Sequence, residues 1–277
     1  MMLRTSIFAR LMLCAGLSVG AMAALPVTAF ASDGGPEIAA PTSGKATVVL
    51  VHGAFADSSS WNGVVAALRS KGYPVIAVAN PLRTVKGDAA AVASVVKSIS
   101  GPVVLVGHSY GGSVISTAAE GLPNVKALVF VAAFAPEAGE TAKDLSGRFP
   151  GSTLGPTLAA PVTLDDGSKE LYIQQDKFRA QFAADVPRAA AQMMAVGQRP
   201  ITEAALGEGA GTPAWKHVPS YFIYGSADKN IPAAAMQFMA QRAGAKESVE
   251  IKGASHVVMT SHPAEVAKII EDADAAR

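Results

Sequence analysis

Cysteine is almost absent from this sequence, since Cys14 is the only one among 277 residues and it lies in an apolar N-terminal segment. We expect that segment to be removed, which would leave the mature chain without a disulfide, a thiolate nucleophile or a cysteine-ligated metal. The histidines do not suggest a metal site either, because no two of them stand at ligand spacing with a carboxylate nearby.

An excess of charge of either sign is also missing, because 23 basic residues stand against 22 acidic ones. Removing residues 1–31 takes away Arg4 and Arg10 and leaves a net charge near −1. Such a chain has no electrostatic reason to bind nucleic acid or an anionic membrane, so neither is expected as a partner. Hydrophobic residues make up 50% of the chain, which is typical of a globular enzyme.

The first 31 residues predict a secretory signal peptide. Arg4 and Arg10 precede an apolar run over residues 11–30, and Ala29-Phe30-Ala31 offers the small residues of a cleavage site. An uncleaved membrane anchor is the alternative, because the run is nearly long enough to span a bilayer, but glycines and a proline interrupt it. We expect cleavage after Ala31, a secreted or periplasmic protein, and no stable membrane association afterwards.

Residues 32–44 are rich in Gly, Pro, Ser and Ala and predict a flexible lead-in. Beyond them, short apolar runs alternate with helical stretches. The runs lack polar alternation, which indicates strands buried on both faces of a parallel sheet covered by helices. The predicted strands are residues 47–51, 74–78, 103–106, 127–131, 220–224 and 248–251, and the predicted helices are residues 61–70, 88–99, 112–120, 233–242 and 263–273. Residues 45–277 are thus expected to form one α/β domain.

Residues 136–216 interrupt this alternation, since they contain many Pro, Gly, Ala and Met residues but no strongly buried strand. We interpret them as an insertion over the C-terminal edge of the sheet. Within it we expect two helices and a β-hairpin around the turn Asp165-Asp166-Gly167-Ser168. The expected hairpin strands are residues 161–164 and 170–173, and the expected helices are residues 174–184 and 187–196.

The strongest chemical signal is Gly107-His108-Ser109-Tyr110-Gly111, a G-x-S-x-G pattern between a buried strand and a helix. This context is typical of a nucleophile elbow, a strained turn whose flanking glycines are required because side chains there would collide. The helix that follows would direct its free N–H groups and positive dipole end toward a developing oxyanion. A plain glycine-rich turn is the structural alternative.

A serine nucleophile requires a base within hydrogen-bonding reach and an acid that orients the base. His256 follows the last predicted strand, at the sheet edge where sites of open α/β folds gather. Asp228 follows the preceding strand, in the chain order that this class uses, although an Asx turn or a helix cap would also explain it. Its rivals all lie in the insertion: Asp165, Asp166, Asp176 and Asp185. Structural, packing or surface roles are expected for the other histidines, His52, His108, His217 and His262.

An oxyanion hole requires the N–H after the nucleophile and another from the loop after an early strand. Tyr110 supplies the first. The turn His52-Gly53-Ala54 supplies the second through Ala54, with Phe55 as the alternative. Because the backbone makes these bonds, side-chain identity is expected to matter little at both positions.

Four segments carry a resemblance to a known family: H-G-A-F at 52–55, G-H-S-Y-G-G at 107–112, S-A-D-K-N-I-P at 226–232 and G-A-S-H-V-V-M at 253–259. They are similar to α/β-hydrolase fold serine esterases of the methylesterase and hydroxynitrile lyase group, which includes bacterial carboxylesterases. The resemblance implies a mostly parallel sheet flanked by helices, with a small cap between strands 6 and 7. It also implies a triad of Ser109, Asp228 and His256, an oxyanion hole of Ala54 and Tyr110, and hydrolysis of small carboxylic esters without a cofactor.

Two positions narrow the choice within this fold. The hydroxynitrile lyases of the group place a lysine directly after the catalytic histidine, and here that position is Val257, so cyanogenic lyase activity is not expected. Haloalkane dehalogenases and epoxide hydrolases attack with aspartate, whereas this elbow holds Ser109. Cofactor-free perhydrolysis of the haloperoxidase-like kind, lactone opening, and a non-catalytic small-molecule binding protein stay as alternatives.

A small ester is the expected partner, and apolar side chains near the turn and the insertion are candidates for the pocket wall. They are Phe55, Phe134, Phe149, Leu158, Met193 and Met194. Plain packing within the insertion is the alternative for the members that lie there. The sequence gives no indication of the oligomeric state.

Overall fold

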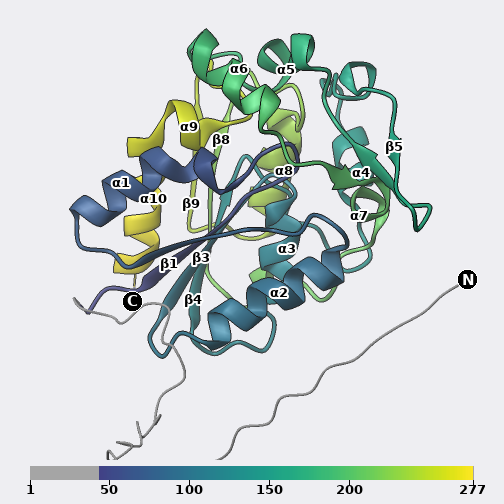
Figure 1. The fold of residues 1–277 in the computed structure, drawn as a ribbon. Helices are drawn as coiled ribbons and strands as arrows, with labels where there is room; N and C mark the ends of the chain where they lie inside the picture. Colours follow the sequence, from purple (N-terminus) through teal and green to yellow (C-terminus); the bar gives the residue numbers. More distant parts are fainter. Residues whose placement is uncertain (1–43, 277) are drawn as a thin grey trace, which may run out of the picture. The chain divides into compact units, whose positions relative to one another are not determined.

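The computed structural model describes residues 44–276, and a parallel six-stranded sheet forms the centre of this part of the chain (Figure 1). The strand order is β2-β1-β3-β4-β8-β9, and every neighbouring pair is parallel. The strands are β1 (Thr47–Val51), β2 (Val75–Val78), β3 (Val103–His108), β4 (Val125–Val131), β8 (Ser220–Gly225) and β9 (Glu247–Ile251). All six predicted strands are present, and the predicted signal peptide and most of the lead-in lie outside the described residues.

Burial follows position in the sheet. Every residue of β1, β3 and β8 is buried, as the lack of polar alternation predicts. The edge strands β2 and β9 are more open, and β9 alternates between half-buried residues and the exposed Ser248 and Glu250. These two strands have a neighbour on one side only, so water reaches part of their surface.

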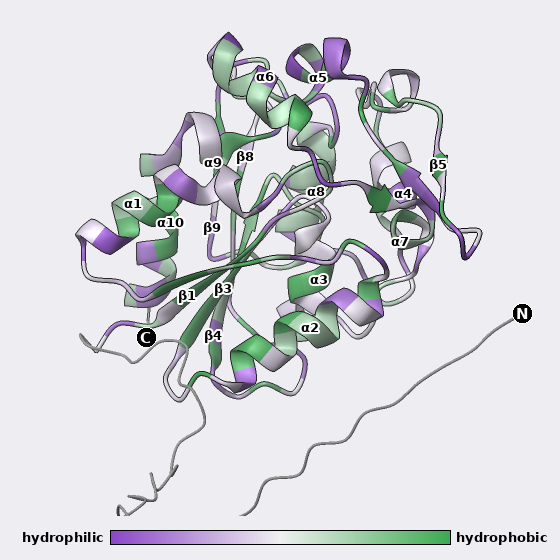
Figure 2. Cartoon of the chain, in the orientation of Figure 1, coloured by the Kyte–Doolittle hydropathy of each residue, from purple (hydrophilic) through white to green (hydrophobic). Residues whose placement is uncertain are grey.

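Helices cover both faces of the sheet, with α1 and α10 on one side and α2 and α3 on the other (Figure 1). The helices outside the insertion are α1 (Asn62–Ser70), α2 (Val85–Lys97), α3 (Gly111–Ala118), α8 (Ala233–Arg242), α9 (Val258–Ser261) and α10 (Pro263–Ala275). Hydrophobic residues concentrate along the central strands and the inward helix faces (Figure 2). No helix among residues 44–276 is long and apolar enough to cross a membrane.

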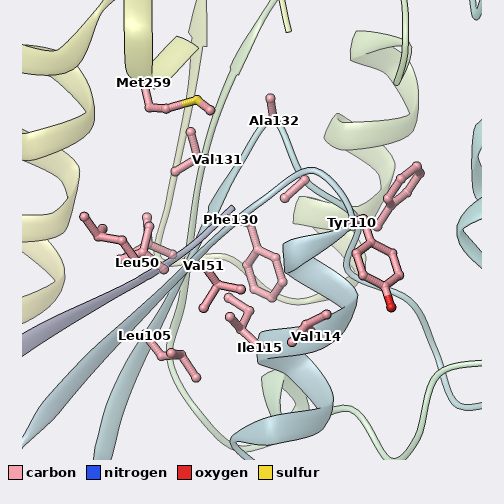
Figure 3. Packing of buried hydrophobic residues seen from close by; sticks show 14 of the residues in the cluster. Leu50, Val51, Leu105, Tyr110, Val114, Ile115, Phe130, Val131, Ala132 and Met259 are labelled. Atoms are coloured by element: carbon pink, nitrogen blue, oxygen red, sulfur yellow. The ribbon is translucent and has the colours of Figure 1, made fainter. Parts of the chain in front are cut away.

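The core lies between the sheet and its helices. Side chains of β1, β3 and β4, such as Leu105 and Phe130, meet Val114 and Ile115 of α3 (Figure 3). The rings of Phe130 and Phe222, from the neighbouring strands β4 and β8, stack with centroids 4.6 Å apart. These side chains are fully buried, so they hold α3 firmly against the sheet.

The insertion lies between β4 and β8 and forms a cap with its own antiparallel sheet, in the order β5-β6-β7. The resemblance placed this cap between strands 6 and 7 by the family's count; here those are the fourth and fifth strands of the described main sheet. The predicted hairpin and two helices are present. The cap contains α4 (Ala142–Gly147), β5 (Val162–Thr163), β6 (Lys169–Leu171), α5 (Gln175–Phe182), α6 (Arg188–Val196), β7 (Ile201–Thr202) and α7 (Glu203–Gly207). The short elements α4, β7 and α7 were not predicted.

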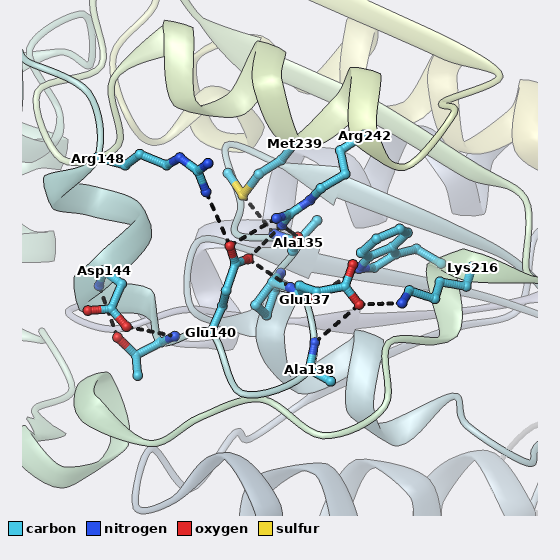
Figure 4. Close-up of polar contacts among 12 residues, drawn as sticks. Ala135, Glu137, Ala138, Glu140, Asp144, Arg148, Lys216, Met239 and Arg242 are labelled. Carbon is cyan, nitrogen blue, oxygen red and sulfur yellow. Dashed lines mark hydrogen bonds and ion pairs between the residues drawn. The ribbon is translucent and has the colours of Figure 1, made fainter.

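A partly buried ion-pair network fastens the start of the cap to α8 (Figure 4). The guanidinium of Arg242 donates to both carboxylate oxygens of Glu140, at 2.7 and 2.9 Å, and to the carbonyl of Ala135 at 2.8 Å. Arg148 of the cap reaches the same carboxylate at 3.3 Å. The network therefore fixes the segment that leaves β4 before α4 begins.

Glycines permit close backbone packing where β3 turns into α3. A Cβ at Gly107 would lie 2.5 Å from the carbonyl oxygen of Gly111, so the predicted collision across the bend is present there. A Cβ at Gly111 would instead meet the carbonyl oxygen of Val51 at 2.6 Å, and one at Gly112 would meet that of Phe134 at 2.1 Å. Close contacts therefore confine the turn on three sides: within the turn, against β1, and against the segment after β4.

We expect Gly112→Ala to destabilise the fold, because the new methyl group would collide with backbone that cannot rotate away. The free energy of unfolding should fall by about 1–3 kcal/mol or more, the usual cost of overpacking. Urea denaturation measures this change. The matched control is Gly147→Ala at the end of α4, where a Cβ would meet nothing within 4 Å; equal effects of the two substitutions would contradict the prediction.

Candidate active site

Ser109 stands at the turn between β3 and α3 in a left-handed backbone conformation, with φ of 53°. A residue with a side chain adopts this conformation only when its surroundings enforce it. Here the Ser109 N–H donates to the carbonyl of Val131 at 3.3 Å, and its carbonyl accepts from the N–H groups of Gly112 and Phe134. Backbone bonds on both sides therefore hold the serine at the C-terminal edge of the sheet.

Three predicted residues meet at this edge. The Nε2 atom of His256 lies 2.9 Å from the hydroxyl oxygen of Ser109, and its Nδ1 atom lies 2.6 Å from Oδ2 of Asp228. All three residues are less than 10% exposed. An ionised carboxylate only accepts hydrogen bonds, so the proton belongs on Nδ1 and Nε2 is left to accept from the serine hydroxyl.

The carboxylate of Asp228 also organises its own loop. Its Oδ1 atom accepts from the N–H groups of Asn230 at 2.7 Å and Ile231 at 3.0 Å, which is the Asx turn considered as the alternative. The two interpretations hold together, because one oxygen shapes the turn and the other accepts from His256. The other carboxylates considered do not reach the imidazole of His256: Asp165, Asp166, Asp176 and Asp185.

Two backbone N–H groups near Ser109, those of Ala54 and Tyr110, have no hydrogen-bond partner within residues 44–276. Ala54 comes next to Ser109 because Gly53 approaches so closely that a Cβ on it would lie 2.6 Å from Cβ of Ser109. The N–H of Phe55 donates to the carbonyl of Arg199 at 2.9 Å and is already bonded. The structure therefore favours Ala54 over Phe55 as the second N–H of the predicted oxyanion hole.

The other four histidines bond backbone groups or surface carboxylates. His108 is buried, and its Nε2 atom lies 3.1 Å from the carbonyl oxygen of His256, so its ring supports the loop that carries His256. Nε2 of His52 accepts from the N–H of Asn80 at 3.0 Å, which leaves Nδ1 to donate to Gly53. His217 and His262 are partly exposed and pair with carboxylates at the surface.

A cavity of about 660 Å³ opens beside Ser109 and His256, with mostly apolar walls. Three of the six predicted wall residues line it: Phe55, Phe134 and Leu158. The prediction was wrong for the other three. Phe149 packs on Phe238 instead, with ring centroids 5.6 Å apart, and Met193 and Met194 line a separate hollow of about 230 Å³ beside α6.

Several wall residues were not predicted, namely Leu154, Leu171, Phe182, Leu206 and Ile231. They come from short or irregular cap segments and from the Asp228 loop. An apolar residue in such a segment has the same appearance in the sequence whether it faces the cavity or the interior of the cap. Only the packing of the cap separates the two sets.

The C-terminal end of α5 contacts the two loops that carry Asp228 and His256. The Nε2 amide of Gln181 donates to the carbonyl of Lys229 at 2.9 Å and to Oδ1 of Asn230 at 3.1 Å, next to Asp228. The ring of Phe182 packs edge-on against His256, with centroids 5.0 Å apart. The hydroxyl of Ser255 donates to Asp185, just past the helix. The cap thus forms part of the wall that excludes water from the imidazole.

Residues 48–269 match the family model described as the alpha/beta hydrolase family. The chain belongs to the alpha/beta hydrolase family. This confirms the predicted fold and the family resemblance.

Among similar members of the alpha/beta hydrolase family, a carbendazim hydrolyzing esterase from Nocardioides sp. is 33% identical over 112 residues, which span 35% of this chain and 45% of that protein. Polyneuridine aldehyde esterase from Rauvolfia serpentina is 26% identical over 252 residues, covering 81% of this chain and 94% of the relative. A crystal structure of polyneuridine aldehyde esterase superposes with a TM-score of 0.72 at 22% identity, covering 82% and 98% of the two chains. The structural likeness shows the shared fold.

Two buried histidines should make the stability of this hydrolase depend on pH. Burial lowers the pKa of His108 well below its ordinary value, and the neighbouring His256 lowers it further. Burial also lowers the pKa of His52. The unfolded chain therefore binds a proton on each imidazole near pH ~6.5, whereas the folded chain does not. Stability from this source is complete above that pH and falls as the pH drops through it.

We expect His108→Gln to weaken the loss of stability in acid, since glutamine keeps a donor for the His256 carbonyl but does not titrate. Below pH ~6.5 the free energy of unfolding of the unaltered protein should fall by up to about 1.4 kcal/mol per pH unit for each such histidine. Chemical denaturation at several pH values measures the slope. A variant with the same slope as the unaltered chain would show that His108 does not contribute.

Proposed function

We propose that this protein is a serine hydrolase that cleaves small carboxylic esters through an acyl-enzyme intermediate. Ser109 is the nucleophile, His256 the general base and Asp228 the residue that orients the base. The observation that carries the proposal is the continuous chain of hydrogen bonds from Asp228 through His256 to Ser109. The relatives named as esterases support an ester as the substrate.

In the first half of the reaction, Nε2 of His256 accepts the proton of the Ser109 hydroxyl while the serine oxygen attacks the ester carbonyl. Asp228 holds the imidazole in the required tautomer and stabilises its protonated form. The N–H groups of Ala54 and Tyr110, which have no partner in the described chain, donate to the tetrahedral oxyanion. His256 then protonates the leaving alcohol, and the acyl group stays on Ser109.

In the second half, a water molecule takes the place of the alcohol. His256 removes a proton from the water as it attacks the acyl carbonyl, and the same two N–H groups stabilise the second oxyanion. Collapse of this intermediate returns the proton to Ser109 and releases the carboxylic acid. Every proton transfer uses Nε2 of His256, the one ring nitrogen that faces the serine.

The cavity supports a substrate that is mainly apolar. Phe134, Leu154, Leu158 and Ile231 contribute to its wall, and its volume of about 660 Å³ lies within the range of small-molecule sites. Charged side chains at this wall, Lys143 and Glu203, are exposed to solvent, which places charge toward the outside. The acyl or alcohol group would thus contact apolar side chains while its carbonyl faces Ser109.

Ser109→Ala should reduce kcat/KM for p-nitrophenyl acetate and butyrate by about 10³-fold or more, because removing a triad member leaves only binding and the oxyanion hole. A fluorophosphonate probe should label the unaltered protein but not this variant. Ser152→Ala is the matched control, since it removes another hydroxyl from the cavity wall. Full turnover by Ser109→Ala would rule out the proposed mechanism.

Leu158→Trp should shift substrate preference toward short esters, because the indole ring would fill part of the cavity. We expect the ratio of kcat/KM for p-nitrophenyl octanoate to that for the acetate to fall about tenfold or more. Met193→Trp serves as the control, since Met193 lies outside this cavity and is 72% exposed. If both variants show the same ratio, the cavity does not bind the acyl chain.

A further inference from the structure

Asp88 is a buried carboxylate that the proposed reaction does not use. It lies in the first turn of α2 and is fully buried. Its Oδ2 atom accepts from the hydroxyl of Tyr110 at 2.9 Å, and its two oxygens lie 3.1 and 3.2 Å from the backbone N of Arg83. A buried carboxylate is costly unless it is well hydrogen-bonded. The Tyr110 hydroxyl and the Arg83 N–H supply hydrogen bonds to Asp88.

Tyr110 connects the carboxylate of Asp88 to the turn that holds Ser109. Its backbone N–H is one of the two proposed oxyanion donors, and its side chain extends from the N-terminal end of α3 (Figure 3). The residue is fully buried, and its hydroxyl bonds to Asp88. Burial raises the pKa of the Tyr110 hydroxyl, and the carboxylate of Asp88 raises it further, so the hydroxyl remains a donor. The residue is therefore fixed both at its backbone and at the tip of its side chain.

The segment that leads to Asp88 also supports the other proposed donor. The N–H of Asn80 donates to Nε2 of His52 at 3.0 Å, and the Nδ2 amide of Asn80 donates to the carbonyl of His52 at 2.9 Å. His52 is two residues before Ala54, whose N–H is the second donor. Residues 80–88 thus touch the segments of both donors.

The cap holds the other side of this segment. The N–H of Thr202 donates to the carbonyl of Leu82 at 3.1 Å, and its hydroxyl donates to the carbonyl of Arg83 at 2.6 Å. The N–H of Val85 donates to a carboxylate oxygen of Glu208 at 2.5 Å. Leu82 has a φ of 61°, a conformation that these bonds enforce. The support for Asp88 therefore extends from α2 into the cap.

We propose that Asp88 is a positioning residue for the oxyanion hole: its bond to the Tyr110 hydroxyl fixes the peptide between Ser109 and Tyr110 so that the Tyr110 N–H points at the reacting carbonyl oxygen. This inference rests on the proposed function. It also departs from the expectation that side-chain identity matters little at this position, because the backbone donor is aimed through its own side chain.

Tyr110→Phe tests the inference, because it removes the hydroxyl and keeps the ring. The N–H should then be less well aligned with the oxyanion, and kcat for p-nitrophenyl butyrate should fall about tenfold or more. KM should stay within about twofold, since the donor acts mainly in the transition state. The inhibition constant of a trifluoromethyl ketone, which adds to the serine to form an oxyanion, should weaken by the same factor as kcat.

Tyr73→Phe is the matched control. Tyr73 is also buried, and burial and the nearby carboxylate of Asp274 raise the pKa of its hydroxyl, but it precedes β2 and so lies at the opposite edge of the sheet. We expect this variant to match the unaltered protein in kcat, KM and inhibition. Equal results for Tyr110→Phe and Tyr73→Phe would overturn the inference, as would a rise in KM with unchanged kcat.

Asp88→Asn provides a second test should Tyr110→Phe not fold. It keeps the size of the side chain and an acceptor for the Arg83 N–H, but it removes the charge that holds the tyrosine hydroxyl. The same loss in kcat and in inhibitor affinity is expected, and unchanged values would overturn the inference. An unaltered protein with no esterase activity would overturn the proposed function itself, whereas an active one with normal Tyr110→Phe and Asp88→Asn variants would overturn the role of Asp88 alone.

Discussion

The site depends on one close contact between two stretches of backbone, where Gly53 lies against Ser109. A Cβ on Gly53 would lie 2.6 Å from that of the serine, so no other residue fits without moving one of the two turns. The contact places the Ala54 N–H next to the hydroxyl of the serine. The left-handed conformation of Ser109 turns that hydroxyl out of the sheet and toward His256. Ser109, His256 and the N–H groups of Ala54 and Tyr110 therefore derive their relative positions from backbone packing.

Buried polar groups extend this packing outward in layers. His108 supports the carbonyl of His256, and Asp228 closes its own turn while it accepts from the imidazole. Further out, Gln181 and Asp185 of the cap bind the loops on which Asp228 and His256 stand. Each of these groups bonds a specific partner, although Nδ1 of His108 is buried without one, so a shift of the loops would leave further buried polar atoms unpaired.

The main sheet, most of its helices and the three residues at its edge could be predicted from the sequence. The strands and most helices were predicted because apolar runs of different period distinguish buried strands from amphipathic helices. Ser109, Asp228 and His256 were selected because each follows a strand, and the C-terminal ends of parallel strands meet at one edge. That rule uses only chain order and local pattern. The structure brings the three together with hydrogen-bonding geometry.

What the sequence did not reveal depends on how side chains far apart in the chain pack. Phe149 and Met193 were assigned to the pocket, yet they lie elsewhere, because apolar residues of an irregular cap have no periodicity that reveals their direction. The bond between Tyr110 and Asp88 was missed for a related reason. Asp88 resembles an ordinary acidic residue in the first turn of a helix, where it favours the dipole. Only the approach of α2 to α3 makes it a buried acceptor.

The end of α5 joins the cap to the loops that carry Asp228 and His256. Because Gln181, Phe182 and Asp185 contact the loops of Asp228 and His256, a cap that moved away as one rigid body would displace both of these side chains. The β5–β6 hairpin and α4 make no such bonds to these loops through their strand and helix residues, with the exception of Ser146. Displacement of the hairpin would therefore leave the contacts of the His256 imidazole intact, whereas displacement of the end of α5 would not.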